Sequence, residues 1–124
     1  MKNNFWCGKK VFITGADGFI GGWIAKTLIE LQATVVVIVR DLKINALDIH
    51  KIKEKDTIIQ GDITNYLLIQ RVLNEYSIEY IFHLAAQALV EIANRSPVST
   101  FESNIKGTWT VLEAARNTST IKGI

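Results

Sequence analysis

Cysteine and histidine are scarce in this sequence, and their scarcity argues against two common kinds of site. Cys7 is the only cysteine in 124 residues, so no disulfide can form within the chain. His50 and His83 lie far apart, and no spacing of Cys and His matches that of a zinc site. We therefore predict no metal site and a reducing, cytoplasmic environment.

Long apolar runs and a large net charge are also missing. No window approaches the ~18 uninterrupted apolar residues of a membrane span, and the first ten residues lack the apolar stretch of a signal peptide. The net charge is only +2, and the mild basic cluster at 50–55 is interrupted by Glu54, as on a solvated loop. With 48% hydrophobic residues, the composition predicts a globular protein without a membrane or nucleic-acid partner.

Strand-like and helix-like segments alternate along the chain. Runs rich in Val, Ile and aromatic residues predict strands near 11–14, 35–39, 57–60 and 80–84, and residues 121–124 resemble the approach to a further strand. The unbroken apolar run at 35–39 is typical of a parallel sheet covered on both faces. We predict an α/β fold, a Rossmann-like doubly wound parallel sheet of about four to five strands, and assign residues 1–124 to one dinucleotide-binding domain.

The expected helices are defined by apolar residues at helical spacing. The first, near 19–31, should pack on the sheet through Phe19, Ile20, Trp23, Ile24, Leu28 and Leu31. Gln32 follows it at a position that glycine often occupies. A second helix is expected to carry Leu67, Leu68, Val72 and Leu73. For residues 42–56 we predict a short helix or a partly ordered loop around Leu42, Leu47, Ile49 and Ile52. The last helix should begin with a capping box at Ser99 and Glu102 and continue its apolar face through Phe101, Ile105, Val111, Leu112 and Ala115.

Three glycines spaced by three residues follow the first strand and open the first helix. In a dinucleotide site the first glycine permits a sharp turn, the second lets the backbone approach a pyrophosphate, and the third lets helix and strand pack closely. The free N–H groups of the helix then bind the anion. The alternative is a structural turn of an α/β protein. We predict cofactor contacts from Gly15, Asp17, Gly18, Phe19, Ile20 and Gly21.

Acidic, basic and small residues follow the later strands. Asp41 lies 20 residues beyond Gly21, at the position where an acidic residue binds the adenosine ribose of NAD. Arg40 beside it would accommodate the 2′-phosphate of NADP. The alternative is that the two residues form an exposed ion pair. Asp62 and Ile63 are predicted to contact adenine, although Asp62 could equally start a helix as its N-cap.

The fourth strand is followed by small side chains that would let a ribose come close. We assign Leu84, Ala85, Ala86 and Gln87 to the nicotinamide side of the cofactor, with Ala-rich packing at a helix start as the alternative. His83, which has no charged partner that the sequence identifies, is expected to be a packed strand residue rather than a base.

Four segments in the same order resemble the extended short-chain dehydrogenase/reductase family: TGxxGFIG at 14–21, GDI at 61–63, HLAAQ at 83–87 and NIxGT at 104–108. Within it the sequence is most similar to nucleotide-sugar dehydratases and epimerases, and FWxGKKVF at 5–12 and FHLAAQALV at 82–90 further resemble the CDP-glucose 4,6-dehydratases. The resemblance implies NAD, or alternatively NADP, as cofactor. It also implies a nucleotide-diphosphate sugar as substrate of the full-length enzyme, and a homodimer through the helix near 100–116.

The resemblance further implies a catalytic tyrosine followed four residues later by a lysine, and this pair is missing. The residues four positions after Tyr66, Tyr76 and Tyr80 are Gln70, Tyr80 and Leu84. Of the family's active-site elements only Asn104, which positions that lysine through water, has a counterpart, and it could also be an ordinary polar helix residue. We predict the N-terminal, cofactor-binding part of such an enzyme, without turnover of its own. The alternatives are a non-catalytic Rossmann-like module and part of an NADP-dependent reductase.

Overall fold

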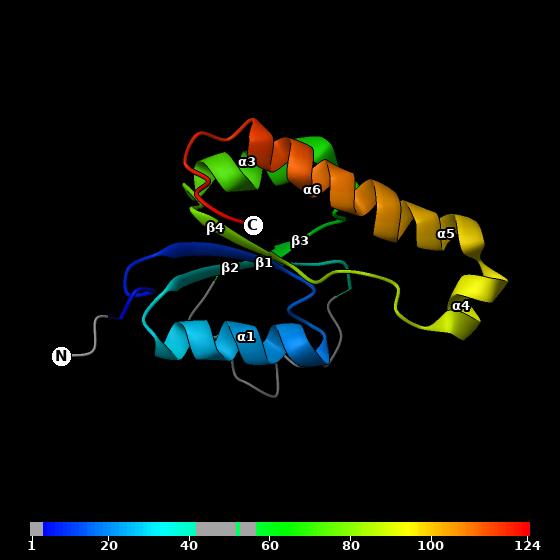
Figure 1. Ribbon diagram of the computed structural model, residues 1–124, viewed down its shortest axis with the longest axis horizontal. Helices are drawn as coiled ribbons and strands as arrows, with labels where there is room; N and C mark the ends of the chain where they lie inside the picture. The colour runs from blue at the N-terminus through cyan, green and yellow to red at the C-terminus, as the bar shows by residue number, and fades with distance from the viewer. Residues whose placement is uncertain (1–3, 42–51, 53–56) are drawn as a thin grey trace.

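The protein is built on a four-stranded parallel sheet with helices on both faces (Figure 1). The computed structural model describes residues 4–41, 52 and 57–124. The strand order is β3-β2-β1-β4, with strands β1 (Lys10–Thr14), β2 (Thr34–Val39), β3 (Thr57–Gln60) and β4 (Tyr80–His83). Every pairing is parallel, which confirms the predicted Rossmann-like fold class.

Residues of the central strands alternate between two apolar cores. Val35, Val37 and Val39 of β2 pack on the side of helix α1 (Phe19–Glu30). Val36 and Ile38 face the opposite core, which includes residues of α3 (Tyr66–Glu75) and α6 (Gly107–Arg116). Because both faces are covered, every residue from 35 to 39 is buried, as the unbroken apolar run predicts.

Helix α1 presents only part of the predicted face to the sheet. Its buried residues are Gly21, Gly22, Ala25 and Leu28, whereas Phe19 and Ile20 are 81% and 63% exposed, and Trp23 is exposed too. The helix begins so close to the first loop that a Cβ on Gly21 would lie 2.1 Å from the carbonyl oxygen of Gly15. The sheet-facing side therefore combines small residues with Leu28 and the partly buried Ile24, as predicted, whereas the predicted packing of Phe19, Ile20 and Trp23 was wrong.

Both α1 and α3 end in the same backbone motif. Gln32 and Ser77, the residues after the two C-caps, have φ of 62° and 50°. After α1, the N–H of Gln32 donates to the carbonyl of Ile29, and the next N–H reaches back to Leu28; Ser77 and Ile78 repeat this pattern after α3. This is the Schellman motif, whose left-handed position favours glycine. The structure thus confirms that Gln32 stands at a glycine-favouring position.

The C-terminal helices form a nearly continuous rod that extends beyond the sheet (Figure 1). Helix α4 (Val90–Arg95) precedes α5 (Pro97–Phe101), the π-helix η2 (Glu102–Lys106) and α6. The predicted capping box was wrong, because Pro97 already occupies the first helical turn and the Ser99 hydroxyl donates to the Ser96 carbonyl. Of the predicted apolar face only Val111 and Ala115 are buried; Phe101, Ile105 and Leu112 are exposed.

The edge of β4 receives the last residues of the described chain. Gly123 forms a parallel bridge with Tyr80, as expected for the approach to a further strand. The Glu79 carboxylate anchors this region, because the Lys122 ammonium and the Lys10 backbone N–H bind it and lower its pKa. Among the predicted core residues of 42–56, Ile52 is buried beside the α1-side core; Leu42, Leu47, Ile49 and the basic cluster lie outside the described residues.

Candidate functional site

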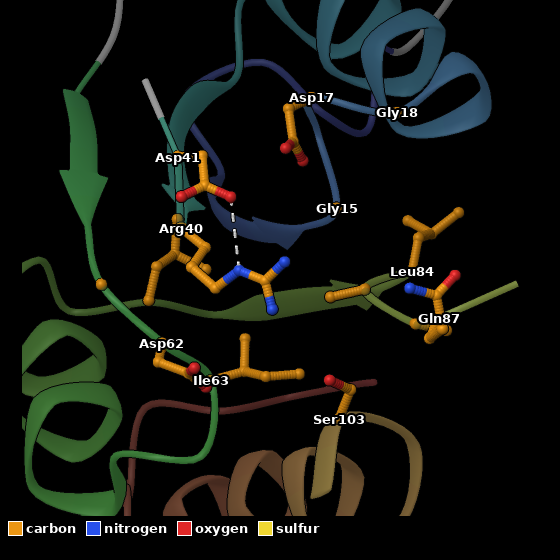
Figure 2. Close-up of a pocket in the computed structure, with 14 residues that line it drawn as sticks. Gly15, Asp17, Gly18, Arg40, Asp41, Asp62, Ile63, Leu84, Gln87 and Ser103 are labelled. Atoms are coloured by element: carbon orange, nitrogen blue, oxygen red, sulfur yellow. Dashed lines mark hydrogen bonds and ion pairs between the residues drawn. The ribbon is translucent and has the colours of Figure 1, made fainter. Parts of the chain in front are cut away.

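A cleft of about 320 Å³ lies at the carboxyl end of the sheet. Figure 2 shows that its walls come from segments far apart in sequence: the loop after β1 on one side, the loop after β3 on the other, and the end of β4 between them. The lining residues are Gly15, Asp17, Gly18, Ile38, Arg40, Asp41, Gly61, Asp62, Ile63, Leu84, Ala85, Ala86, Gln87 and Ser103. Ligands of open α/β sheets bind at this end, where the strand order reverses.

The loop after β1 requires glycine for two reasons. Gly15 has φ of +74°, and a Cβ there would lie 2.7 Å from the backbone nitrogen of Ala85. Gly18 donates its N–H to the Gly15 carbonyl at 3.1 Å and then starts α1 with no side-chain cap. Since the first N–H groups of a helix have no partner within it, the start of α1 offers donors to an anion.

Of the four remaining predicted residues of this loop region, only Asp17 lines the cleft. Phe19 and Ile20 do not line the cleft, and their side chains are exposed. Their predicted contacts are therefore restricted to backbone N–H groups at the helix start. Gly21 does not line the cleft either, because it packs beneath the Gly15 carbonyl.

Arg40 and Asp41 stand together at the end of β2. The Arg40 Nε lies 3.5 Å from Asp41 Oδ2, as the dashed line in Figure 2 marks, and their side chains are 67% and 57% exposed. An exposed pair at this distance is worth at most about 1 kcal/mol, so either side chain is free to turn toward a ligand. The geometry keeps both predicted roles open.

Asp62 shapes the loop after β3 and does not cap the next helix. Its Oδ1 accepts hydrogen bonds from the backbone N–H and the hydroxyl of Thr64, both at 2.8 Å. The N-cap of α3 is Asn65, whose Oδ1 accepts from the N–H of Leu68. The alternative prediction of Asp62 as the N-cap was therefore wrong.

The carboxyl group of Asp62 is held in its charged form. The backbone N–H of Thr64 is the main cause of its lowered pKa; the Thr64 hydroxyl and the positive charges of Arg40 and Lys106 add to it, and partial burial opposes it. The cleft therefore carries an ionised acceptor near the end of β3, next to the side chain of Ile63.

Two side chains hold the segment that follows β4. The hydroxyl oxygen of Thr14 accepts from the N–H groups of Leu84 and Ala85, each at 3.1 Å. Asn104 accepts from the Gln87 N–H at 2.7 Å through Oδ1 and donates to the Gln87 carbonyl at 3.0 Å through Nδ2. The predicted site residue Asn104 therefore clamps the backbone of the cleft wall.

His83 is half-buried behind this wall, and its pKa is lowered by burial. Its Nδ1 lies 2.7 Å from the Thr14 hydroxyl and its Nε2 lies 3.1 Å from the Thr108 hydroxyl. This position agrees with the prediction of a packed strand residue.

Three residues that line the cleft, and Thr14 behind it, were not predicted from the sequence. Ile38 lies two residues before Arg40 and Gly61 directly precedes Asp62, so their places at strand ends could have indicated them. Ser103 reaches the cleft from η2, and no sequence signal of a π-helix was available. Thr14 lies in the TGxxG segment itself, but its hydrogen bonds to the fourth strand depend on the strand order.

The GDP-mannose 4,6 dehydratase family model matches residues 12–124, which is nearly the whole chain. The chain belongs to this family. One curated relative is the CDP-glucose 4,6-dehydratase of Salmonella typhimurium, to which this chain is 32% identical over 133 aligned positions. The alignment covers all of this chain and 35% of that protein. This chain spans about a third of the length of the curated relatives it matches.

Solved structures of related enzymes share the fold of this dehydratase-family chain. The UDP-glucose 4-epimerase of Thermotoga maritima, solved with UDP-glucose, superposes with a TM-score of 0.80 at 28% identity, covering 92% of this chain and 37% of that one. The UDP-glucose 4-epimerase of Thermus thermophilus, solved with NAD, also gives 0.80 at 28% identity, covering 92% and 36%.

No helix in the described part of the chain combines the length and apolar character that crossing a membrane requires.

Proposed function

We propose that this chain is the NAD-binding domain, residues 1–124, of a nucleotide-sugar 4,6-dehydratase or epimerase. The observation that carries the proposal is the convergence of four strand ends on one cleft, with a glycine loop and an uncapped helix start on one wall and an ionised carboxylate on another. These residues fit a dinucleotide, because the uncapped N–H groups at the start of α1 suit a pyrophosphate, and Gly15 and Gly18 line the cleft there without a side chain. Related solved structures contain NAD.

Each wall of the cleft takes one part of the cofactor in this proposal. The loop from Gly15 to Gly18 and the first N–H groups of α1 bind the pyrophosphate. Asp41 binds the adenosine ribose and Asp62, beside Ile63, accepts from the adenine amino group. The backbone and small side chains of residues 84–87 contact the ribose on the nicotinamide side.

The bound cofactor supplies hydride transfer at C4 of a nucleotide-linked hexose. The residues of this chain bind and orient it, and they place its nicotinamide end toward β4. The tyrosine and lysine that the resemblance assigns to proton transfer are not among residues 1–124. The three tyrosines are otherwise placed; Tyr66, for example, lies on α3 and accepts a hydrogen bond from Asn117. We therefore expect binding without turnover from this chain alone.

Calorimetric titration with NAD and NADP tests the proposal and separates Asp41 from Arg40. A carboxylate that binds a ribose hydroxyl pair contributes hydrogen bonds to a charged group, so Asp41→Ala should weaken NAD binding about tenfold or more. Arg40→Ala is the matched control, and it should leave NAD affinity nearly unchanged. If Arg40 instead accommodates a 2′-phosphate, NADP will bind more tightly and Arg40→Ala will remove that preference. No heat with either cofactor at millimolar concentration would contradict the proposed function.

A homodimer through the C-terminal rod is a second element of the proposal. Large apolar side chains recur along its exposed side at Phe101, Ile105, Trp109 and Leu112. Phe101 ends α5, Ile105 lies in η2, and Trp109 and Leu112 lie on α6, so exposed apolar side chains recur along the whole rod, and such a surface favours association with another chain. Sedimentation of the wild type and of Ile105→Glu tests the dimer. A folded dimer that binds no dinucleotide would favour the alternative of a non-catalytic module. A cytoplasmic location is predicted for either function.

A further inference from the structure

A chain of hydrogen bonds runs behind the cleft from β1 through β4 to α6. The Thr14 hydroxyl lies 2.7 Å from His83 Nδ1, and His83 Nε2 lies 3.1 Å from the Thr108 hydroxyl. Thr108 in turn donates to the backbone carbonyl of Asn104 at 2.7 Å. The network therefore connects the residue before the glycine loop with the residue that clamps Gln87.

The direction of each hydrogen bond follows from counting donors and acceptors. A threonine hydroxyl has one hydrogen to donate and two lone pairs to accept. The Thr14 hydroxyl oxygen already accepts from the N–H groups of Leu84 and Ala85, and an N–H group can only donate. Its own hydrogen must therefore point to His83 Nδ1, which accepts.

The other end of the network requires the same arrangement. A backbone carbonyl can only accept, so the Thr108 hydroxyl donates its hydrogen to Asn104. Thr108 is then left to accept from His83, whose Nε2 must carry the ring hydrogen. Two independent counts thus define a neutral His83 with Nδ1 free of hydrogen and Nε2 protonated.

The groups tied down by this network all belong to one wall of the cleft. Thr14 holds the N–H groups of Leu84 and Ala85, and Asn104 holds both the N–H and the carbonyl of Gln87. Asn104 itself lies in η2, and π-helical turns of this kind occur frequently at functional sites. Among the described hydrogen bonds, the side chains of His83 and Thr108 together join Thr14 to Asn104.

We propose that His83 is a positioning residue: as a neutral imidazole protonated on Nε2, it couples Thr14 to Thr108 and so fixes the backbone of residues 84–87 as the cofactor-facing wall. The effect on dinucleotide affinity rests on the proposed function, whereas the effect on the wall itself does not.

A matched pair of variants on α6 separates this role from general packing. Thr108→Val removes the hydroxyl that links His83 to Asn104. Thr110→Val makes the same change two residues later, at a fully buried threonine whose hydroxyl has no hydrogen-bond partner in the described part of the chain. Thr108→Ser keeps the hydroxyl and should restore the wild-type behaviour.

Nuclear magnetic resonance of the ligand-free chain tests the wall directly. Nitrogen spectra of the imidazole, with His83 assigned through a His50→Gln variant, should show hydrogen on Nε2 and none on Nδ1 at neutral pH. In Thr108→Val, the amides of Ala85 and Gln87 should exchange with solvent about five- to tenfold faster, as expected for one lost hydrogen bond, whereas Leu84 keeps its hydrogen bond to the Thr14 carbonyl and should change less. Hydrogen on Nδ1, or equal exchange in Thr108→Val and Thr110→Val, would overturn the proposal.

Calorimetry with NAD then measures the functional consequence. Thr108→Val should weaken binding about five- to tenfold, with little change in Thr110→Val and Thr108→Ser. Equal affinity for the two valine variants would overturn the positioning role in binding. If the wild type binds neither NAD nor NADP, the proposed function fails, and the spectra and exchange rates of the free chain still decide the role of His83.

Discussion

Alanine substitution at Gly15 and Gly8 separates the cost of backbone conformation from the cost of crowding. The two glycines have nearly identical left-handed backbones, with φ of +74° and +72°. An alanine pays about 1–2 kcal/mol for this conformation at either position. A Cβ on Gly8 would meet nothing within 4 Å, whereas on Gly15 it would lie 2.7 Å from two backbone atoms, the nitrogen of Ala85 and the carbonyl carbon of Leu84.

The crowding at Gly15 should appear as an additional loss of stability. The atoms in its way are backbone and are tied to β1 by the hydrogen bond from the Leu84 N–H to the Thr14 carbonyl, so they cannot move aside alone. Overpacking of this kind costs about 1–3 kcal/mol. We expect Gly8→Ala to lower the free energy of unfolding by about 1–2 kcal/mol and Gly15→Ala by about 2–5 kcal/mol.

Urea unfolding followed by circular dichroism measures both losses, because each variant keeps the same overall fold and should show an unchanged dependence on urea. The difference between the variants is the informative quantity, since the conformational cost cancels. Equal losses for Gly8→Ala and Gly15→Ala would refute the reasoning that the glycine loop rests against the end of β4. Gly15→Ala alone should also abolish dinucleotide binding.

Two further predictions concern helix ends and pH. Gln32→Gly and Ser77→Gly should each raise the free energy of unfolding by about 0.5–1 kcal/mol, because glycine accepts the left-handed positions that these residues occupy; alanine at the same positions should give no gain. Burial lowers the pKa of His83 below its usual value of 6.5, so the unfolded chain takes up this proton first as the pH falls. Stability should be complete above about pH 6.5 and decline below it. As the pH falls through this range, the urea concentration at the unfolding midpoint should decrease less in His83→Asn than in the wild type. An identical dependence of the midpoint on pH in the two proteins would contradict the assignment of this effect to His83.

The sheet and the location of the cleft could be predicted from the sequence because both depend on local patterns. The run from Val35 to Val39 is apolar without interruption, which only a strand buried on both faces explains well. Parallel strands place all their carboxyl ends at one edge, so Arg40, Asp62 and Ala85 were expected to approach one another although they lie far apart in sequence.

The orientation of the helices could not be read from apolar residues alone. Helix α1 has large apolar side chains on more than one side, and the face that packs is decided by how closely Gly21 approaches the first loop. The start of the C-terminal rod was misjudged for a similar reason. Ser99 and Glu102 have capping-box spacing, but the helix already begins two residues before Ser99, at Pro97, which has no backbone N–H that needs a partner. The roles of Asn104 and Ser103 depend on η2, a departure from α-helical geometry that arises only in the folded chain.

The central position of β1 determines the order in which the sheet can be assembled. Its partner β2 follows it closely in sequence, whereas Thr14 and His83, neighbours across β1 and β4, are 69 residues apart. Strands that are far apart in sequence pair slowly, because the entropy of closing the long loop between them is lost before their contacts form. The cleft has walls on both sides of this junction, so it is absent from every partly folded state in which β4 is undocked. A ligand at one hundred times its dissociation constant would add about 2.7 kcal/mol to the assembled state alone. Ligand binding would therefore reinforce the pairing of β1 with β4, whose strands lie far apart in sequence.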